Sequence, residues 1–196
     1  MAYFERLWSE LPDGVPEHFA RRRDFLLSEL EPGSRVLDVG CGAGWFAGAL
    51  KQAGFAVTGV DVAAEPLRRA RERLPQLEFV LAGEHELPFA AGSFDAAWLG
   101  ELLEHVQDGI GLLEQVTRVL VPGGSLVVST PDHGWRLRLR LGLSRRAFER
   151  HFEPRADHVR FFTAGTLVAL LQVCGFEAIE ARRERGLLLA SARAPR

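Results

Sequence analysis

The chain has 196 residues, of which 47% are hydrophobic and 26% are charged, a balance typical of a globular domain with a full core. Its formal net charge of −2 gives no global electrostatic basis for binding nucleic acid. No apolar run approaches the ~18 residues of a membrane span, and the N-terminus has no hydrophobic signal-peptide core. We therefore expect one cytoplasmic domain over residues 1–196, without stable membrane insertion.

The first part of the chain alternates between predicted helices and strands. Residues 1–30 are expected to form cap helices, with Pro12 and Gly14 preventing one long helix and Glu17–Leu30 forming an amphipathic one. The predicted strands that follow are Arg35–Val39, Ala56–Val60, Leu77–Leu81, Phe94–Leu99 and Ser125–Ser129, and the helices are Trp45–Ala53, Glu65–Leu74 and about Glu101–Leu120. Alternation at this spacing indicates a parallel sheet with helices on both faces.

The last part of the chain has a different pattern. A helix over Thr166–Cys174 precedes two strands, Phe176–Ala181 and Leu187–Ala192, which are joined by the charged segment Arg182–Gly186. A short link between neighbouring strands requires an antiparallel pair. The predicted fold is therefore an α/β three-layer sandwich with a seven-stranded, mostly parallel sheet that finishes in an antiparallel C-terminal hairpin at one edge.

The first strand runs into a glycine-rich turn with glycines at positions 40, 42 and 44. Glycines let the backbone turn sharply and approach a ligand closely, and the following helix N-terminus offers free N–H groups. A dinucleotide-binding fingerprint needs the spacing G-x-G-x-x-G, whereas position 45 is Trp. The spacing disfavours an NAD-dependent enzyme, which is kept as one alternative.

Two carboxylates accompany this turn. Asp38 sits at the end of the first strand, where it can hold the ammonium of a cationic cofactor but would repel a pyrophosphate. Asp61 closes the second strand, 21 residues after Gly40, and an acidic group there can accept hydrogen bonds from both hydroxyls of a ribose. The alternative is a generic nucleotide-binding fold in which these carboxylates only cap helices.

Several motifs together resemble one family. Val36–Phe46, Gly59–Asp61, Ser93–Asp95 and Leu103–Val106 resemble the class I S-adenosylmethionine-dependent methyltransferases, and among them the small-molecule enzymes of ubiquinone biosynthesis. The resemblance is strong over residues 33–130 and weaker over residues 158–177. It implies a Rossmann-like methyltransferase fold, S-adenosylmethionine as cofactor and a small-molecule acceptor whose identity it leaves open.

The resemblance also implies which residues bind the cofactor. They are Asp38, Gly40, Cys41, Gly42, Gly44, Trp45, Phe46, Asp61, Val62, Glu84, His85, Leu99 and Gly100. Gly83 stands where the family often has the aspartate of its adenine-binding loop. Either Glu84 substitutes for that aspartate, or the adenine contact is made by backbone alone.

Methyl transfer is a displacement at a sulfonium methyl with a neutral leaving group, so the enzyme mainly supplies proximity and alignment. A base is needed only when the acceptor must lose a proton, and histidine suits that task because its pKa is close to neutral pH. His133 follows the fifth strand at the edge where α/β sheets bind ligands, and His158 is a second candidate. For both, a surface or turn histidine is the alternative, and the Glu104–His105 pair is expected to be structural.

We expect transfer to oxygen, with nitrogen and carbon as alternatives. A non-catalytic S-adenosylmethionine-binding regulator or scaffold is the rival function. Cys41 and Cys174 have no partners at metal-ligand spacing, so they are expected to be reduced thiols, and no metal site is expected.

Residues 131–160 are expected to form an arginine-rich lid insertion, the place where the resembling family commonly builds a substrate lid. Eight arginines against four carboxylates leave this segment with a formal charge of +4. Alternating leucines fit a strand, while Trp135, Leu139 and Leu143 fit one face of a helix. The segment could recognise an acidic acceptor, contact a membrane that carries a lipid-like one, or be a solvated lid or dimer contact, so monomer and homodimer both stay open. Arg21–Arg23 is expected to form a solvated helix face.

Overall fold

The computed structural model describes residues 2–10, 12, 14–83, 86–152 and 158–196. Seven strands form one sheet in the order β3-β2-β1-β4-β5-β7-β6. The strands are β1 (Arg35–Val39), β2 (Ala56–Asp61), β3 (Glu78–Leu81), β4 (Phe94–Gly100), β5 (Leu120–Pro131), β6 (Glu177–Glu184) and β7 (Leu187–Arg193). The helices are α1 (Ala2–Glu10), α2 (Phe19–Ser28), α3 (Trp45–Gln52), α4 (Ala64–Arg73), α5 (Gly109–Val119), α6 (Trp135–Leu143), α7 (Arg145–His151) and α8 (Ala164–Val173).

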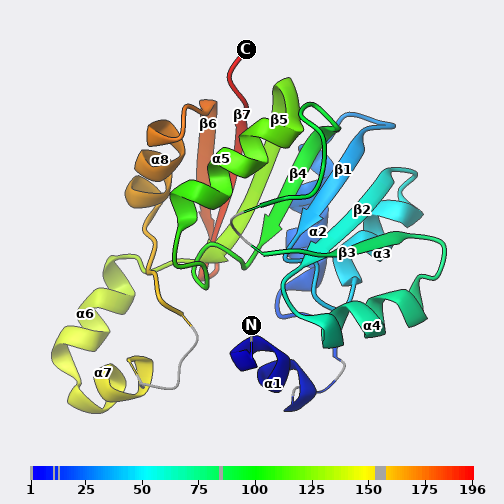
Figure 1. Ribbon diagram of the computed structural model, residues 1–196. Coiled ribbons are helices and arrows are strands. Elements are labelled where there is room, and N and C mark those ends of the chain that lie inside the picture. Colours follow the sequence, from blue (N-terminus) through cyan, green and yellow to red (C-terminus); the bar gives the residue numbers. More distant parts are fainter. Residues whose placement is uncertain (1, 11, 13, 84–85, 153–157) are drawn as a thin grey trace.

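Two buried clusters, one on each face of the sheet, make up the core. One contains side chains of α5 and α8, and the other contains side chains of α2, α3 and α4 (Figure 1). Neighbouring strand residues point to opposite faces, so Leu37 joins the first cluster and Val36 the second. The three-layer sandwich predicted from the sequence is confirmed.

The C-terminal hairpin is antiparallel and lies at the edge of the sheet, as predicted. The return strand β7 pairs with β5 and its residues Leu187–Ala190 are buried, whereas β6 is the mostly exposed edge strand. The predicted charged link is shorter than expected, because Arg182 to Glu184 extend β6 and only Arg185 and Gly186 make the turn. Both turn residues have positive φ, +48° and +92°, as a tight hairpin turn requires.

The predicted helix over Glu101–Leu120 is wrong in its first half. The side chain of Asp108 accepts a hydrogen bond from the Gly111 amide at 2.9 Å, and this N-cap starts α5 only at Gly109. Glu101 has a left-handed backbone with φ +57°, which ends β4 and begins an irregular turn segment. The segment between β4 and α5 is therefore not helical, and its turns, rather than a helical repeat, set the directions of its side chains.

The arginine-rich segment forms two short helices, α6 and α7. Of the two structures that its leucine pattern allowed, a strand or a helix, the helix is therefore the one found. Ser144 joins them and caps α7, accepting a hydrogen bond from the Ala147 amide at 3.2 Å. Both helices stand away from the sheet (Figure 1), and Trp135 and Leu143 are 57% and 78% exposed. Within the described residues, no helix is both long and apolar enough to cross a membrane.

The strand order places a ligand site at one edge of the sheet. From β1 the chain builds outward to β2 and β3, and then returns to place β4 on the other side of β1. Such a reversal opens a crevice at the carboxyl ends of the strands, where open α/β sheets bind ligands. In Figure 1 this edge faces downward, toward α1 and the α6–α7 segment.

Candidate cofactor and acceptor site

The turn after β1 needs its glycines. Gly40, Gly42 and Gly44 all have left-handed backbones, with φ of +69°, +51° and +79°. The Gly40 amide donates to the Val60 carbonyl at 2.8 Å, which ties the loop to the end of β2. A Cβ on Gly40 would lie 2.8 Å from a methyl of Leu102. The loop is thus a close-packed cradle that only glycine can form at these positions.

Asp61 closes β2 beside this loop and is buried. Its two carboxylate oxygens accept hydrogen bonds from the amides of Gly42 at 2.9 Å and Ala63 at 3.0 Å. Burial raises the pKa of Asp61, and these backbone donors partly oppose the rise. Each carboxylate oxygen can accept a further hydrogen bond, so the group fits the hydroxyls of a ribose.

Asp38 is a buried carboxylate at the end of β1, with 2% of its surface exposed. Its Oδ2 atom has no hydrogen-bond partner among the described residues. Burial, and then the charge of Asp61, raise the pKa of Asp38 to about 7. A buried carboxylate oxygen without a partner is costly, and the ammonium of an amino-acid moiety would satisfy it. The residues present therefore fit a cationic cofactor with a ribose.

Arg22 joins this site, which the sequence analysis missed. The expectation of a solvated helix face is wrong for Arg22, because only 3% of it is exposed. Its Nε atom donates to the Ser129 hydroxyl at 3.0 Å, its guanidinium lies 4.7 Å from the centre of the Phe46 ring, and burial lowers its pKa. The signal was available, since Arg22 shares the inner face of α2 with Phe25 and Leu26, three and four residues later.

The remaining expected cofactor residues line or support the loop. The side chains of Cys41, Phe46 and Leu99 are buried in the core clusters, so they support the loop from behind. Both cysteines are free thiols. The Trp45 ring lies 4.1 Å from the guanidinium of Arg73. Val62 directly follows Asp61, and Gly100 is the last residue of β4; both are half-buried. Glu84 and His85 lie outside the described residues.

Helix α1 lies over the glycine loop. The Glu5 carboxylate accepts hydrogen bonds from the first amides of α4, at Ala64 and Glu65, and an Arg69 guanidinium nitrogen donates to the Trp8 carbonyl at 2.8 Å. A Cβ on Gly42 would lie 2.9 Å from the Trp8 ring. The hydrogen bonds of Glu5 and Trp8 with α4 thus hold the N-terminal helix over the cofactor side of the crevice.

His133 lies on the other side of the crevice, just beyond the end of β5. It is 7% exposed, so it is not a surface histidine, while its place in the loop after β5 leaves the alternative of a turn histidine open. Its ring centre lies 4.9 Å from Phe161 and 5.3 Å from His151 of α7, and its Nδ1 atom has no hydrogen-bond partner among the described residues. Burial, and then the charge of His151, lower the pKa of His133, so the surroundings favour the neutral imidazole.

His158 belongs to a different group from His133. Its ring centre lies 4.7 Å from that of His105, beside the fully buried Glu104. Glu104 accepts a hydrogen bond from the Thr130 hydroxyl at 2.9 Å. Burial, and then the charge of Glu101, raise the pKa of Glu104 to about 8. The two candidate bases therefore have different surroundings.

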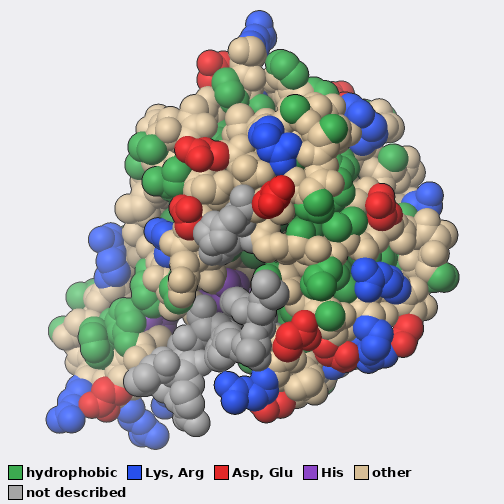
Figure 2. Space-filling model, viewed as in Figure 1, with side chains coloured by type: hydrophobic (Ala, Val, Ile, Leu, Met, Phe, Trp, Pro, Cys, Tyr) green, Lys and Arg blue, Asp and Glu red, His purple; other side chains and the backbone are tan. Residues whose placement is uncertain are grey.

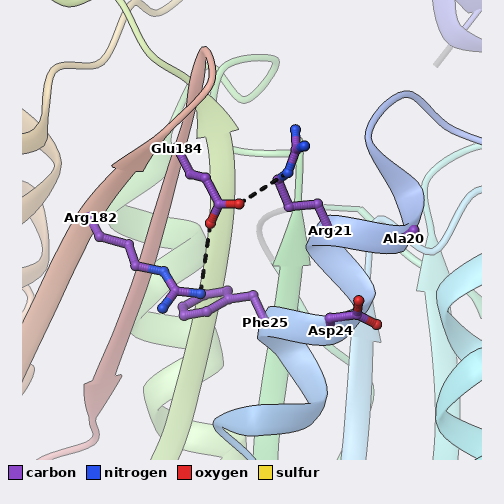
Figure 3. A pocket seen from close by; sticks show the side chains of 6 residues that line it. All are labelled: Ala20, Arg21, Asp24, Phe25, Arg182 and Glu184. Carbon is purple, nitrogen blue, oxygen red and sulfur yellow. Dashed lines mark ion pairs between the residues drawn. The ribbon is translucent and has the colours of Figure 1, made fainter.

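A separate groove lies between α2 and β6 (Figure 3). It is lined by Ala20, Arg21, Asp24, Phe25, Arg182 and Glu184. Arg21 and Glu184 form an ion pair at 3.0 Å, and the Arg182 guanidinium lies 4.6 Å from the centre of the Phe25 ring. The groove is at the β6 edge of the sheet, whereas the glycine loop follows β1, so it is no part of the cofactor site.

Comparisons with known proteins agree with this geometry. Residues 11–181 match the sequence family described as a methyltransferase domain. A ubiquinone biosynthesis O-methyltransferase of Xanthomonas campestris is 37% identical over 115 residues, which is 56% of this chain and 48% of that protein. An uncharacterized transposon protein of Streptomyces fradiae is 40% identical over 110 residues, 53% of this chain and 32% of that protein. The chain thus matches less than half the length of these relatives.

Solved structures share the fold. A S-adenosylmethionine-dependent methyltransferase of Mesorhizobium loti has a TM-score of 0.69 at 25% identity, covering 92% of this chain and 99% of that one. A phosphoethanolamine N-methyltransferase of Haemonchus contortus, in complex with S-adenosylmethionine, has a TM-score of 0.76 at 18% identity, covering 99% of this chain and 57% of that one.

The chain belongs to the methyltransferase domain family, and its fold and site define a class I S-adenosylmethionine-dependent methyltransferase. The predicted class and cofactor are confirmed.

Proposed function

We propose that this protein transfers a methyl group from S-adenosylmethionine to a hydroxyl oxygen of a small-molecule acceptor. The observation that carries the choice of oxygen is His133, a buried neutral imidazole with an unpartnered Nδ1 at the ligand-binding edge of the sheet. A hydroxyl must lose its proton on methylation, whereas a neutral amine attacks without a base. The similarity to an O-methyltransferase over about half the chain supports the same choice.

The residues of the chain divide the work between binding and proton transfer. Bound S-adenosylmethionine supplies an electrophilic methyl group on a sulfonium. Asp61 holds the ribose hydroxyls, Asp38 holds the ammonium, and Arg22 neutralises negative charge beside them. His133 accepts the proton of the acceptor hydroxyl, while the buried walls of the crevice exclude water. His158 is the second candidate base.

The α6–α7 segment is proposed as the lid that selects the acceptor. Figure 2 shows arginines and hydrophobic side chains side by side over this segment, at the lower left. Leu139 and Phe148 are 52% and 51% exposed, next to Arg138 and Arg145. A surface that combines apolar groups with guanidinium groups fits an acceptor that has both an apolar body and an acid group.

A turnover screen tests the proposed function. Purified protein, S-adenosylmethionine and panels of phenols, hydroxy acids, amines and activated carbon acids are assayed for S-adenosylhomocysteine and for the methylated product. We expect turnover with hydroxyl acceptors that carry an acid group. Turnover confined to amines or carbon acids would contradict the choice of oxygen.

The rival function is a non-catalytic S-adenosylmethionine-binding regulator or scaffold. It predicts tight binding of S-adenosylhomocysteine in calorimetry but no product with any acceptor panel. The Nδ1 atom of His133, which has no hydrogen-bond partner among the described residues, favours the enzyme, because a regulator needs no buried base at this edge of the sheet.

A further inference from the structure

The residues between β4 and α5 meet the segment before α8 in a compact polar cluster that the cofactor does not use. The Glu104 carbonyl accepts hydrogen bonds from the amides of Val159 at 2.8 Å and Arg160 at 3.1 Å. These bonds hold His158 beside the Glu104–His105 pair, although His105 and His158 are 53 positions apart in the sequence. Backbone hydrogen bonds therefore hold the two segments together, and they fix the positions from which the side chains of the cluster extend.

The cluster brings together three groups that could hold a metal ion. Glu104, His105 and His158 each offer one ligand atom, and these atoms all lie within 4.8 Å of one another. Atoms bound to one tetrahedral ion, at bond lengths of about 2.0–2.2 Å, lie roughly 3.3 Å apart. Small rotations of the two half-buried imidazoles would close that difference.

Burial of the carboxylate gives a second, independent indication of a ligand. Glu104 has 0% of its surface exposed, and only its Oε2 atom receives a hydrogen bond, from Thr130. Its Oε1 atom has no hydrogen-bond partner among the described residues. The neighbouring Glu101 is only half-buried, and its Oε1 atom already faces the Arg22 guanidinium at 4.0 Å, so the indication comes from Glu104. A fully buried carboxylate oxygen without a donor favours a cation between it and the imidazoles.

We propose that Glu104, His105 and His158 form a binding site for one divalent transition-metal ion at the acceptor side of the crevice. Two imidazoles and one carboxylate suit Zn²⁺, Co²⁺ or Fe²⁺ and leave open positions for other ligands. His158, a candidate base on sequence grounds, becomes a metal ligand, and His133 remains the base. His105 and His158 are both half-buried, so an ion can reach their rings from solvent.

The role of the ion rests on the proposed function. An acceptor hydroxyl that takes an open position on the metal loses its proton more readily, because the positive charge stabilises the oxygen anion. The proton passes to His133 or to water. The oxygen electron pair then forms the bond to the methyl carbon as the carbon–sulfur bond breaks and its electron pair stays on sulfur. The products are the methyl ether and neutral S-adenosylhomocysteine.

Cobalt binding tests the site directly, without any methyl transfer. The full chain, stripped with chelator, is titrated with Co²⁺ by absorption spectroscopy and with Zn²⁺ by calorimetry. We expect one ion per chain and a visible cobalt spectrum of a site with imidazole ligands. His158→Ala and His105→Ala should each weaken binding at least tenfold, and His151→Ala, which removes a nearby imidazole outside the cluster, should leave affinity unchanged.

Several outcomes would overturn the site. These are no binding of Co²⁺ or Zn²⁺ at millimolar concentration, and unchanged affinity in both cluster variants. Glu104→Gln is a further test if its melting temperature shows that it folds, and unchanged metal affinity in that folded variant would also contradict the site. A chelator that leaves turnover of a hydroxyl acceptor unchanged would overturn the catalytic role, whereas metal binding without any turnover would instead overturn the proposed function.

Discussion

The two sides of the crevice are built in different ways. On the cofactor side, a contiguous stretch from β1 through the glycine loop to α3 carries most of the contacts, and backbone hydrogen bonds tie it to β2. On the acceptor side, side chains from the loops after β4 and β5, from the α6–α7 segment and from the link to α8 meet from distant parts of the sequence. The first side is dense and shaped for one ligand, while the second has exposed apolar and charged groups on a segment that stands away from the sheet. The acceptor side can thus change its residues without disturbing the cofactor side, because the two sides are built from different segments of the chain.

The largest effect is expected on the acceptor side, at the base. His133→Ala should lower kcat for a hydroxyl acceptor by ~100-fold or more, because general-base catalysis contributes about 10²–10⁴-fold. Affinity for S-adenosylhomocysteine should stay within about twofold of wild type, since His133 lies on the other side of the crevice. Steady-state kinetics and calorimetry provide the two measurements. His18→Asn, at an exposed histidine with φ +54°, is a matched control because Asn tolerates that conformation. Unchanged kcat in His133→Ala would exclude the base.

The reverse pattern is expected on the cofactor side. Asp61→Ala should weaken binding of S-adenosylhomocysteine about 100-fold, because hydrogen bonds to a charged acceptor are each worth ~1.5–3 kcal/mol. Calorimetry measures the change. Asp95→Ala removes an equally conspicuous carboxylate, which is paired with Arg35 at 2.8 Å on the surface, and should have little effect. Equal affinities for the two variants would show that Asp61 does not hold the ribose.

Variants at Arg22 and Arg23 compare a buried cation with its more exposed neighbour. Arg22→Met should lower the free energy of unfolding by about 2 kcal/mol, because it removes the bond to Ser129 and the cation facing Glu101, 4.0 Å away. Arg23→Met, at a side chain that is 39% exposed, paired with Asp24 and 5.9 Å from the centre of the Phe19 ring, should change it by less than about 0.5 kcal/mol. Urea unfolding of both variants is the measurement. Similar losses would contradict the distinction.

Cofactor affinity should depend on pH through Asp38. Burial raises the pKa of Asp38 to about 7, so at pH 6 only about a tenth of the free protein carries the charge that attracts the ammonium. The Kd for S-adenosylhomocysteine should therefore rise about tenfold between pH 8 and pH 6. Asp38→Asn should bind weakly at both pH values. A wild-type Kd that is the same at pH 6 and pH 8 would contradict this role.

The smallest effect is expected on the lid. The double variant Arg138→Ala and Arg140→Ala should raise KM for an acid-bearing acceptor by roughly threefold to tenfold, because exposed ion pairs contribute ~0.2–1 kcal/mol each. The increase should disappear at high salt, and KM for S-adenosylmethionine should not change. Kinetics at two ionic strengths provide the test. An equal rise in KM for a neutral hydroxyl acceptor would show that the lid arginines do not recognise the acid group of the acceptor.

The parts predicted well are those that depend on neighbours in the sequence. Strand alternation, the spacing of the glycines and the position of Asp61 are local patterns, and each is found where it was predicted. The predicted helix is wrong over Glu101–Asp108, because the Asp108 side chain caps α5 and the helix begins only at Gly109. The prediction is also wrong at Arg22, where three consecutive arginines suggested a solvated face although helical spacing places only one of them against the core.

The sequence by itself therefore determined the sheet and the cofactor loop, because these follow from periodicity and from glycines whose backbone conformation other residues adopt at a cost. The class of enzyme came from the resemblance of its motifs to a known family. Only the tertiary structure decided that Arg22 and His133 are buried, and that Glu104, His105 and His158 meet. The physical reason is that burial and convergence depend on contacts between segments far apart in the chain. Such contacts form only when the sheet brings the ends of β4 and β5 to the same edge.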